Sequence, residues 1–250
     1  MIKTGLIGHG YWGKKIEDKL LQLSELQFIQ TSVTYNPFFF PTADWIFIAT
    51  PADTHFSIVK DCIDKGVNVF VEKPFCSTLL EAKELIMLAS EKQTSLYVDN
   101  IFLSRSELPK IKNLQCNAIK FRWHKNGPYN DNLINDLLYH DLYILINVVG
   151  YKSISSLKFK VNEKDILFFE FNYGDSNVEI DYNRVSPDKK EKIIYFDKEI
   201  INFTNHDEDP LMVIITNCLQ KKIDFESNHV LNLQTTTLME IIKKHLNHFQ

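Results

Sequence analysis

The sequence predicts an α/β protein with two domains, residues 1–100 and residues 101–250. Two observations predict this class. Over the first hundred residues, short runs rich in Ile, Val and Phe alternate with helical stretches, as in a parallel sheet that is buried on both faces. After Asn100 most runs are strand-like and separated by turn residues, which is typical of an antiparallel sheet.

The first domain is expected to alternate strands and helices. This order predicts parallel pairing through right-handed crossovers. Gly66 ends one helical stretch, and Pro74 precedes the next. Strands are expected at 3–7, 28–35, 45–50, 67–71 and 95–98, and helices at 11–23, 54–65 and 77–92.

The link between Tyr35 and Trp45 has only nine residues, two of them proline. A crossover helix needs about a dozen residues or more. One crossover helix is therefore expected to be missing, which shortens this corner of the sheet. We expect the three phenylalanines at 38–40 to pack as core or to cover this edge, rather than to form a ligand cage.

The second domain is expected to combine helices with an open, mainly antiparallel sheet. Turn signals at 173–175 and 186–188 separate some of its strands. Strands are expected at 118–124, 156–161, 166–173, 176–183, 192–196 and 199–203, and helices at 135–149, 210–220 and 232–247.

Composition excludes several classes of function. The net charge is −4 and no basic block stands out, so no nucleic-acid partner is indicated. The four cysteines form no CxxC pair, so neither a metal site nor a disulfide framework is expected, and a reducing compartment fits better. No signal peptide and no apolar run of about 18 residues is recognisable, so we expect a cytoplasmic protein without a membrane partner.

A glycine-rich loop lies between the first predicted strand and the first predicted helix. In this setting Gly8 allows a tight turn, Gly10 lets the backbone approach a pyrophosphate, and Gly13 permits close packing of helix and strand. The loop predicts a Rossmann-type dinucleotide-binding domain. Tyr11 and Trp12 either cover the cofactor or pack as helix core.

The adenosine end of the predicted cofactor site is less defined. Many such sites carry an acid at the end of the second strand that binds the ribose. Asn36 occupies the expected strand end here, and no Arg follows it to hold a 2′-phosphate. The cofactor is therefore NAD or NADP, and the absence of a cationic clamp favours NAD.

Two further clusters follow predicted strand ends, where open α/β sheets bind ligands. The first contains Thr50, Pro51 and His55, of which His55 either stacks near the nicotinamide or caps its helix. The second is Val71-Glu72-Lys73-Pro74. A lysine at the mouth of a cofactor cleft can have its pKa tuned by burial and by nearby charge.

Taken together, these motifs resemble the Gfo/Idh/MocA oxidoreductase family, over nearly the whole chain. The loop GHGYWGKK is close to the GYWG form of one sugar-related branch that includes sugar-nucleotide dehydrogenases. The other matching segments are ATPADTH at 49–55, VEKP at 71–74, DLLYHD at 136–141, SPDK at 186–189 and DPL at 209–211.

The resemblance implies a Rossmann domain followed by an α/β domain whose sheet forms the floor of the active site. It implies hydride transfer between a nicotinamide and a hydroxyl-bearing carbon of a sugar or sugar nucleotide. The family's lysine corresponds to Lys73, and its Asp and His correspond to Asp136 and His140. It also implies a homo-oligomer, a dimer or a tetramer.

The residue types agree with these implied roles. Asp136 and His140 are four positions apart on one predicted helix and would share a face. Hydride removal from a carbinol needs a base for the proton and a stabiliser for the oxyanion. We expect Lys73 and His140 to form the acid/base pair, without assigning the base, and Asp136 to orient or charge-tune either one. Asp141 could instead be the acid that the substrate meets.

Substrate contacts are expected from Lys73, Trp123, Asn126 and His140, with His124 and Lys125 close by. Two hypotheses follow. The chain is an NAD(P)-dependent dehydrogenase or reductase that acts on CH–OH groups of a sugar or sugar nucleotide. Alternatively, because it is shorter than most members of the family, it is a non-catalytic dinucleotide-binding regulator or pseudoenzyme of the same fold.

Overall fold

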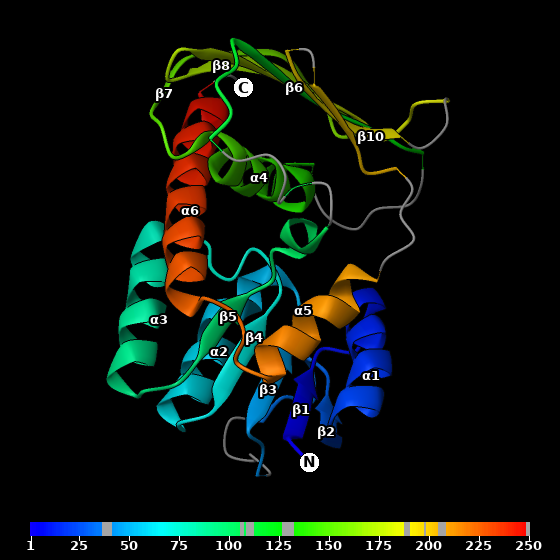
Figure 1. The fold of residues 1–250 in the computed structure, drawn as a ribbon, viewed down its shortest axis with the longest axis vertical. Coiled ribbons are helices and arrows are strands. Elements are labelled where there is room, and N and C mark those ends of the chain that lie inside the picture. Colours follow the sequence, from blue (N-terminus) through cyan, green and yellow to red (C-terminus); the bar gives the residue numbers. More distant parts are fainter. Residues whose placement is uncertain are drawn as a thin grey trace. The chain divides into compact units, whose positions relative to one another are not determined.

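The structure is a computed structural model that describes residues 1–36, 42–105, 108, 113–126, 133–187, 191–197, 199–204 and 209–248. The chain divides into two compact units (Figure 1). Unit 1 contains residues 1–104 and 209–236, and unit 2 contains residues 105–208 and 237–250. A tail segment thus belongs to unit 1, whereas the assignment of a cofactor domain and a substrate domain stays a prediction.

Unit 1 is built on a parallel sheet in the order β2-β1-β3-β4-β5. The order reverses next to β1, and ligands bind at such a switch point in open α/β sheets. The predicted Rossmann-type class is confirmed. The strands are β1 (Lys3–Ile7), β2 (Glu25–Gln30), β3 (Trp45–Ile48), β4 (Asn68–Val71) and β5 (Leu96–Val98).

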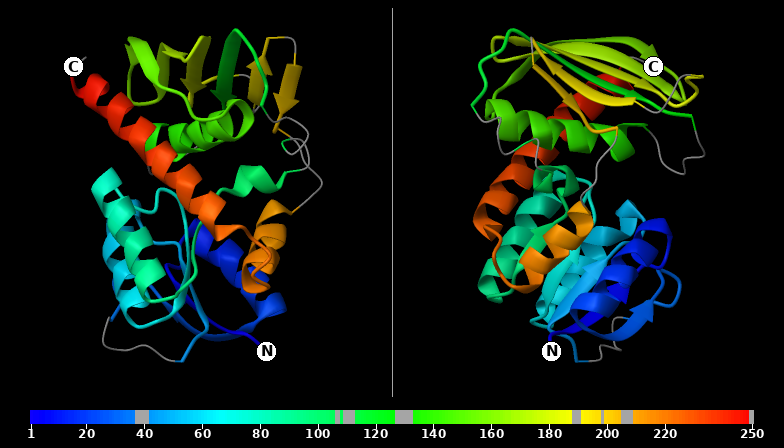
Figure 2. Two further views of the ribbon diagram at one scale, coloured as in Figure 1. Left: turned by 60° about the vertical axis from the view of Figure 1, so that its left-hand side comes forward. Right: turned by 45° about the vertical axis from the view of Figure 1, so that its right-hand side comes forward.

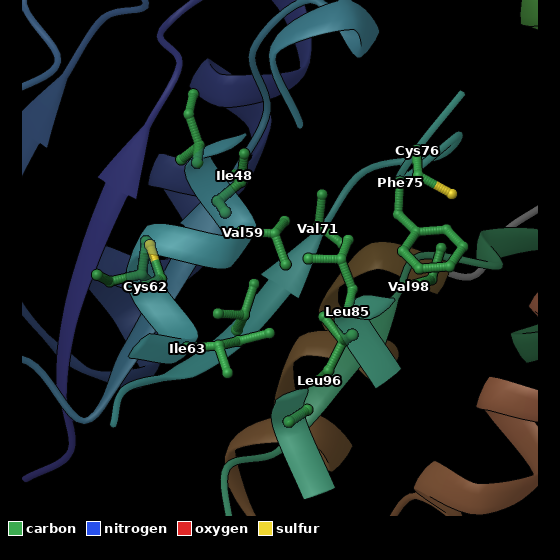
Figure 3. Close-up of a cluster of buried hydrophobic side chains, with 14 of the residues drawn as sticks. Ile48, Val59, Cys62, Ile63, Val71, Phe75, Cys76, Leu85, Leu96 and Val98 are labelled. Atoms are coloured by element: carbon green, nitrogen blue, oxygen red, sulfur yellow. The ribbon is translucent and has the colours of Figure 1, made fainter. Parts of the chain in front are cut away.

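Helices cover both faces of this sheet and create two separate cores. On one face α2 (His55–Asp64) and α3 (Leu79–Glu91) bury Val59, Ile63 and Leu85 against strand residues such as Val71 (Figure 3). On the other face α1 (Tyr11–Leu23) and α5 (Pro210–Leu219) pack over the opposite side chains of the strands. The second face is therefore completed by a helix from the tail, which is capped by Asp209 through the Met212 amide.

The β2–β3 connection contains no helix within its described residues, 31–36 and 42–44. The predicted second strand is wrong at its end, because β2 stops at Gln30 rather than at residue 35. The Thr34 hydroxyl accepts from the Thr31 amide at 2.8 Å, and the Thr31 hydroxyl accepts from the Thr34 amide at 3.1 Å. Such side-chain bonds turn the backbone out of the strand. The phenylalanines at 38–40 lie outside the described residues.

Unit 2 contains a sheet in the order β11-β10-β6-β9-β8-β7. Its pairs are antiparallel except for β6 with β9, which are parallel, so the predicted mainly antiparallel sheet is confirmed. The strands are β6 (Ala118–His124), β7 (Ile154–Asn162), β8 (Ile166–Tyr173), β9 (Ser176–Asn183), β10 (Glu191–Phe196) and β11 (Glu199–Asn202).

One face of the unit 2 sheet is covered by α4 (Tyr139–Val149) (Figure 2). The residues before α4, Ile134–Leu138, form a π-helical turn, so the predicted helix at 135–149 is not uniformly α-helical. Almost every side chain of α4 is buried. Short 3-10 turns lie at Ala52–Thr54 and Ile101–Ser104.

The last helix, α6 (Phe225–Asn247), begins seven residues before the predicted start at 232. Asp224 accepts hydrogen bonds from the amide and the hydroxyl of Ser227, which caps the helix at its observed start. Among the helices of the described residues, none is both long enough and apolar enough to cross a membrane.

The first part of α6 covers β5, which is the edge strand of the unit 1 sheet. The side-chain amide of Asn228 accepts from the Val98 N–H and donates to the Val98 carbonyl, both at 3.0 Å. It therefore pairs with the strand edge as another strand would. The side-chain amides of Asn228 and Asn232 also donate to the side-chain oxygen Oδ1 of Asn100, at 2.9 and 3.0 Å. This asparagine network provides hydrogen-bond partners for backbone groups of the edge strand that would otherwise be free to pair with other chains.

Candidate active site

The glycine-rich loop joins β1 to α1, and the fold itself requires two of its glycines. Gly8 has φ of +104°, and a Cβ there would lie 2.4 Å from the Ala49 carbonyl. A Cβ on Gly13 would lie 2.0 Å from the carbonyl oxygen of Gly8. The roles predicted for Gly8 in the turn and for Gly13 in close packing agree with this geometry.

Gly10 differs from the other two glycines. Its backbone is extended, with φ −79° and ψ −156°, which any residue can adopt. A Cβ at this position would meet nothing within 4 Å. Gly10 is also the N-cap of α1, where unpaired backbone amides and the helix dipole favour an anion. Neither backbone conformation nor internal packing calls for glycine here, so the space beside Gly10 is available to a ligand.

Tyr11 and Trp12 follow this glycine at the start of α1. Their side chains are 72% and 38% exposed, which excludes the prediction that they pack as helix core. The two rings meet edge to face at 5.7 Å, and the Lys15 ammonium lies over both of them, 4.4 and 4.7 Å from the ring centroids. The alternative prediction, that they cover a cofactor, stays open.

His55 connects two loops at the carboxyl edge of the sheet. It is the first residue of α2 but is 1% exposed, and its ring contacts the carbonyls of Pro74 and Thr50, each at 2.8 Å. The helix is therefore not capped by this side chain. Burial lowers the pKa of His55, while the two carbonyls and Asp53 oppose that effect. His55 joins the loop after β3 to the VEKP segment after β4.

Replacing His55 with phenylalanine is expected to lower the free energy of unfolding by about 2 kcal/mol, because a carbonyl that accepts from the imidazole N–H loses its donor. Urea unfolding of the purified variant measures this change. His245→Phe, at an exposed position of α6, is the matched control and should leave stability within about 0.5 kcal/mol of the wild type. Equal stability of the two variants would show that His55 does not hold the loops together.

Thr50 and Pro51 shape the first of these loops. The Thr54 hydroxyl oxygen lies 2.7 Å from both the Thr50 hydroxyl oxygen and the Pro51 carbonyl oxygen, within hydrogen-bond distance of each. Thr50 is buried, and Pro51 is exposed at the start of the 3-10 turn. These contacts fix a short turn directly beyond β3, where Gly8 also makes its close approach to Ala49.

The VEKP segment places Glu72 beside the carboxyl group of Asp99, a residue that was not predicted from the sequence to belong to the site. Val71 pairs with Val98, and the Asp99 amide donates to the Val71 carbonyl at 2.8 Å, so Glu72 and Asp99 directly follow adjacent strand ends. Both are buried. Burial raises the pKa of Asp99 well above its usual range, the charge of Glu72 and a hydrogen bond with it add to this effect, and Lys73 opposes it.

The charge of Glu72 and the hydrogen bond with it therefore favour the protonated form of Asp99. Both carboxyl groups lie near Lys73, the position where the sequence predicts a catalytic lysine. The signal for Asp99 was present in the sequence, since Asp99-Asn100 follows a buried strand at the ligand-binding edge of the sheet.

Asn36, predicted to lie at the adenosine end of the cofactor site, is not at a strand end, because β2 ends at Gln30. The Gln30 carbonyl instead accepts from the Gly8 amide at 2.7 Å, so Gln30 and Thr31 are the residues beside the glycine loop. The position that carries an acid in many dinucleotide sites is therefore close to Thr31, and no carboxylate occurs between Thr31 and Asn36.

In unit 2, Asp136 and His140 do not share a regular α-helical face as predicted, because Asp136 lies in the π-helical turn. The Asp136 carboxylate accepts from the Arg184 guanidinium at 2.5 Å. The His140 Nδ1 lies 2.9 Å from the Tyr143 hydroxyl, and its ring stacks on Trp123 with 6.0 Å between centroids and 11° between planes. Short π segments inside helices often mark functional sites.

The other predicted substrate contacts differ in their surroundings. Trp123 is half-buried, and its indole N–H donates to Asp141 of the same unit, whereas Lys125 and Asn126 beyond the end of β6 are exposed. His124 contacts Asp181 at 2.9 Å. Asp141 is fully buried and faces the sheet, so it does not act as the acid that meets the substrate. Within the described residues no cluster of His, Cys, Asp and Glu is arranged to hold a metal ion.

The strand order and the glycine loop define a Rossmann-type fold, and comparison with known proteins narrows the class of protein further. Residues 36–100 match the model of the Gfo/Idh/MocA family, described as an oxidoreductase family with an NAD-binding Rossmann fold. The predicted resemblance to the Gfo/Idh/MocA family is thereby confirmed.

Two curated relatives illustrate the sequence similarity. The uncharacterised oxidoreductase YdgJ of Escherichia coli is 30% identical over 186 residues, which cover 60% of this chain and 54% of that protein. The UDP-N-acetylglucosamine 3-dehydrogenase of Acidithiobacillus ferrooxidans is 23% identical over 175 residues, which cover 61% of this chain and 56% of that protein. The chain thus spans about half the length of the curated relatives it matches.

Solved structures share the fold more widely. The dehydrogenase GnnA from Acidithiobacillus ferrooxidans has a TM-score of 0.78 at 18% identity, with 96% of each chain covered. The WlbA (WbpB) dehydrogenase from Thermus thermophilus, solved with NAD and α-ketoglutarate, has a TM-score of 0.81 at 12% identity, covering 96% of this chain and 94% of that one. At these identities the likeness establishes the fold.

Proposed function

We propose that this chain is an NAD(P)-dependent oxidoreductase that moves hydride between a nicotinamide and a ring hydroxyl or ketone of a sugar or sugar nucleotide. The observation that carries the proposal is Gly10. It is a glycine that neither backbone conformation nor packing explains, and it lies at a helix N-terminus on the ligand-binding edge of a parallel sheet. A pyrophosphate that approaches this backbone closely explains it.

The residues around this edge fit a dinucleotide. Gly8, Gly10 and Gly13 would hold its pyrophosphate, and Thr50, Pro51 and Glu72 lie on the loops that would receive its nicotinamide half. When bound, the cofactor would accept or return the hydride. The family description and the NAD-bound WlbA structure support NAD as the first choice. The charge of this segment does not exclude NADP, because residues 31–36 contain no carboxylate that would repel its 2′-phosphate.

Lys73 is the proposed residue that handles the hydroxyl proton and the developing oxyanion. Its ammonium form would stabilise negative charge on the substrate oxygen, and its neutral form would accept the proton. The buried carboxyl group of Asp99 interacts electrostatically with this lysine, and Glu72 directly precedes the lysine in the chain. The roles expected for Asp136, His140, Trp123 and Asn126, which belong to unit 2, remain predictions.

The substrate class is supported by what the relatives act on. GnnA is a UDP-N-acetylglucosamine 3-dehydrogenase, and WlbA was also solved with NAD and UDP-GlcNAcA. We therefore propose a nucleotide-activated amino sugar as the first substrate to test. The test is the absorbance of reduced nicotinamide when the protein is incubated with NAD or NADP and a panel of such sugars. Cofactor binding without turnover on any of them would favour the non-catalytic regulator instead.

The role of Gly10 is tested by the variant Gly10→Ala with Gly13→Ala as its matched control. Gly10→Ala should leave the free energy of unfolding within about 0.5 kcal/mol of the wild type but weaken NAD binding at least about tenfold, because the new methyl group occupies the pyrophosphate position. Gly13→Ala should lower stability by about 1–3 kcal/mol, because its Cβ would collide with Gly8.

Calorimetric titration with each cofactor and urea unfolding separate these two effects. Unchanged NAD affinity in Gly10→Ala would contradict the proposed pyrophosphate position. Undetectable binding of both NAD and NADP to the wild-type protein would contradict the proposal that this chain is an NAD(P)-dependent oxidoreductase.

A further inference from the structure

Three side chains form a row across the unit 2 sheet beneath α4. Lys192 of β10 is paired in register with Trp123 of β6, and Trp123 is paired with Tyr182 of β9. Directly paired residues point to the same face of a sheet. Lys192 is 5% exposed and Tyr182 is fully buried. Polar groups on a helix-covered face need partners, since burying them unpaired is costly.

Asp141 on α4 supplies acceptors for this row. Its Oδ1 accepts from the Trp123 indole N–H at 2.9 Å, and its Oδ2 accepts from the Tyr182 hydroxyl at 2.5 Å. The Lys192 ammonium lies 3.1 Å from the centroid of the Trp123 ring. Both carboxylate oxygens are thus engaged by the sheet. The indole is held at its N–H by Asp141 and on its ring by the Lys192 cation.

The ring that Asp141 holds is the one on which His140 stacks. The imidazole lies nearly parallel to the Trp123 ring, at 11°, and its Nδ1 lies 2.9 Å from the Tyr143 hydroxyl. Tyr143 is fully buried. Trp123 and Tyr143 therefore both contact His140, and Trp123 is positioned by the residue that follows His140 in the chain.

We propose that Asp141 is a positioning residue that sets the orientation of His140 by holding Trp123 against the imidazole ring. This inference rests on the proposed function and on the predicted contact of His140 with the substrate. Asp141 itself faces the sheet and does not touch the substrate. A substrate-facing imidazole must be held within a narrow range of geometry, and packing by a fixed neighbouring ring provides that restraint.

The charge of Asp141 depends on pH near neutrality. Burial raises its pKa to about 7, while Lys192 of β10 and the hydrogen bonds from Tyr182 of β9 and Trp123 of β6 oppose the rise. The nearby Asp136–Arg184 pair also faces this region, since Asp136 adds to the rise in the pKa of Tyr182. Above about pH 7 both Asp141 oxygens accept hydrogen bonds, whereas below it one of them carries a proton.

The structural part of the proposal is tested without any assay of activity. The protein is labelled with 5-fluorotryptophan, and the Trp123 resonance is assigned by its loss in Trp123→Phe. In the wild type this resonance should shift with a midpoint near pH 7, and Asp141→Asn should abolish that midpoint. Asp141→Ala should move or broaden it at every pH and should change the ring ¹⁵N shifts of His140.

The functional part is tested by kinetics on the same variants. Asp141→Ala should lower kcat at least about tenfold with little change in the KM for cofactor, and Asp141→Asn, which keeps an acceptor for the indole, should restore kcat to within about threefold of the wild type. Tyr173→Phe, which removes the hydrogen bond from the buried Tyr173 of β8 to the Gly150 carbonyl, controls for general loss of stability and should keep kcat unchanged.

A Trp123 resonance and His140 shifts that are unchanged in Asp141→Ala would overturn the proposal, as would an equal loss of kcat in Tyr173→Phe. Should Asp141→Ala fail to fold, the pH titration of Asp141→Asn decides alone, because a midpoint that persists there cannot come from Asp141. Absence of turnover in the wild type would count against the proposed function and leave the resonance tests intact.

Discussion

Replacing Lys73 with methionine is expected to lower kcat at least about a hundredfold while the affinity for NAD stays within about threefold of the wild type. Methionine keeps an apolar side chain of similar length, so the packing of the VEKP segment is largely preserved. The substitution removes the ammonium group that would stabilise the oxyanion, as well as its neutral form that would accept the proton.

The matched control is Lys83→Met, at an exposed position of α3, which should keep full activity. Steady-state kinetics with the active sugar and calorimetric titration with NAD measure the two quantities separately. A variant that retains both turnover and cofactor binding would show that Lys73 is not the catalytic lysine. A variant that loses cofactor binding as well would place Lys73 in the cofactor site rather than in proton transfer.

The elements that the sequence predicted accurately are those with local signals. α1, β8 and β9 have the predicted bounds, because helical periodicity and strand alternation are decided within each segment. The glycine loop was equally predictable from the sequence, since the requirement for glycine at positions 8 and 13 arises from contacts of a single strand–turn–helix unit and the loop after the neighbouring strand β3.

Errors arose where side chains or distant segments override periodicity. The pattern of apolar residues alone predicted that the second strand ends at residue 35. In the structure β2 ends at Gln30, because hydrogen bonds between Thr31 and Thr34 turn the backbone out of the strand. The helix that contains Asp136 was predicted to be α-helical throughout. The spacing of its apolar residues does not predict the π-helical turn that the structure shows. Both errors displaced a site residue from its expected surroundings.

The buried polar groups of the two units were the least predictable features. Asp99 meets Glu72 only because β4 and β5 are neighbours, and Asp141 meets Trp123 and Tyr182 only because α4 lies on that face of the sheet. Sequence spacing predicts which groups could share a helix or strand. It does not predict pairs that are brought together by the packing of whole elements.

The asparagine network at the edge of β5 is the clearest case of such long-range pairing, and its loss should have the largest effect on stability. Asn228→Leu is expected to lower the free energy of unfolding by about 3 kcal/mol, because the N–H and the carbonyl of Val98 would both lose their partner beneath α6. Leucine has a similar volume, so a cavity does not account for the loss.

Urea unfolding gives the overall change, and amide hydrogen exchange locates it. The Val98 amide, which donates to Asn228, should exchange much faster in the variant, because β5 becomes an uncovered edge strand. Asn247→Leu, at an exposed position of the same helix, should leave both measurements unchanged. A Val98 amide that remains fully protected in Asn228→Leu would show that packing of α6, rather than its asparagine side chains, covers this edge.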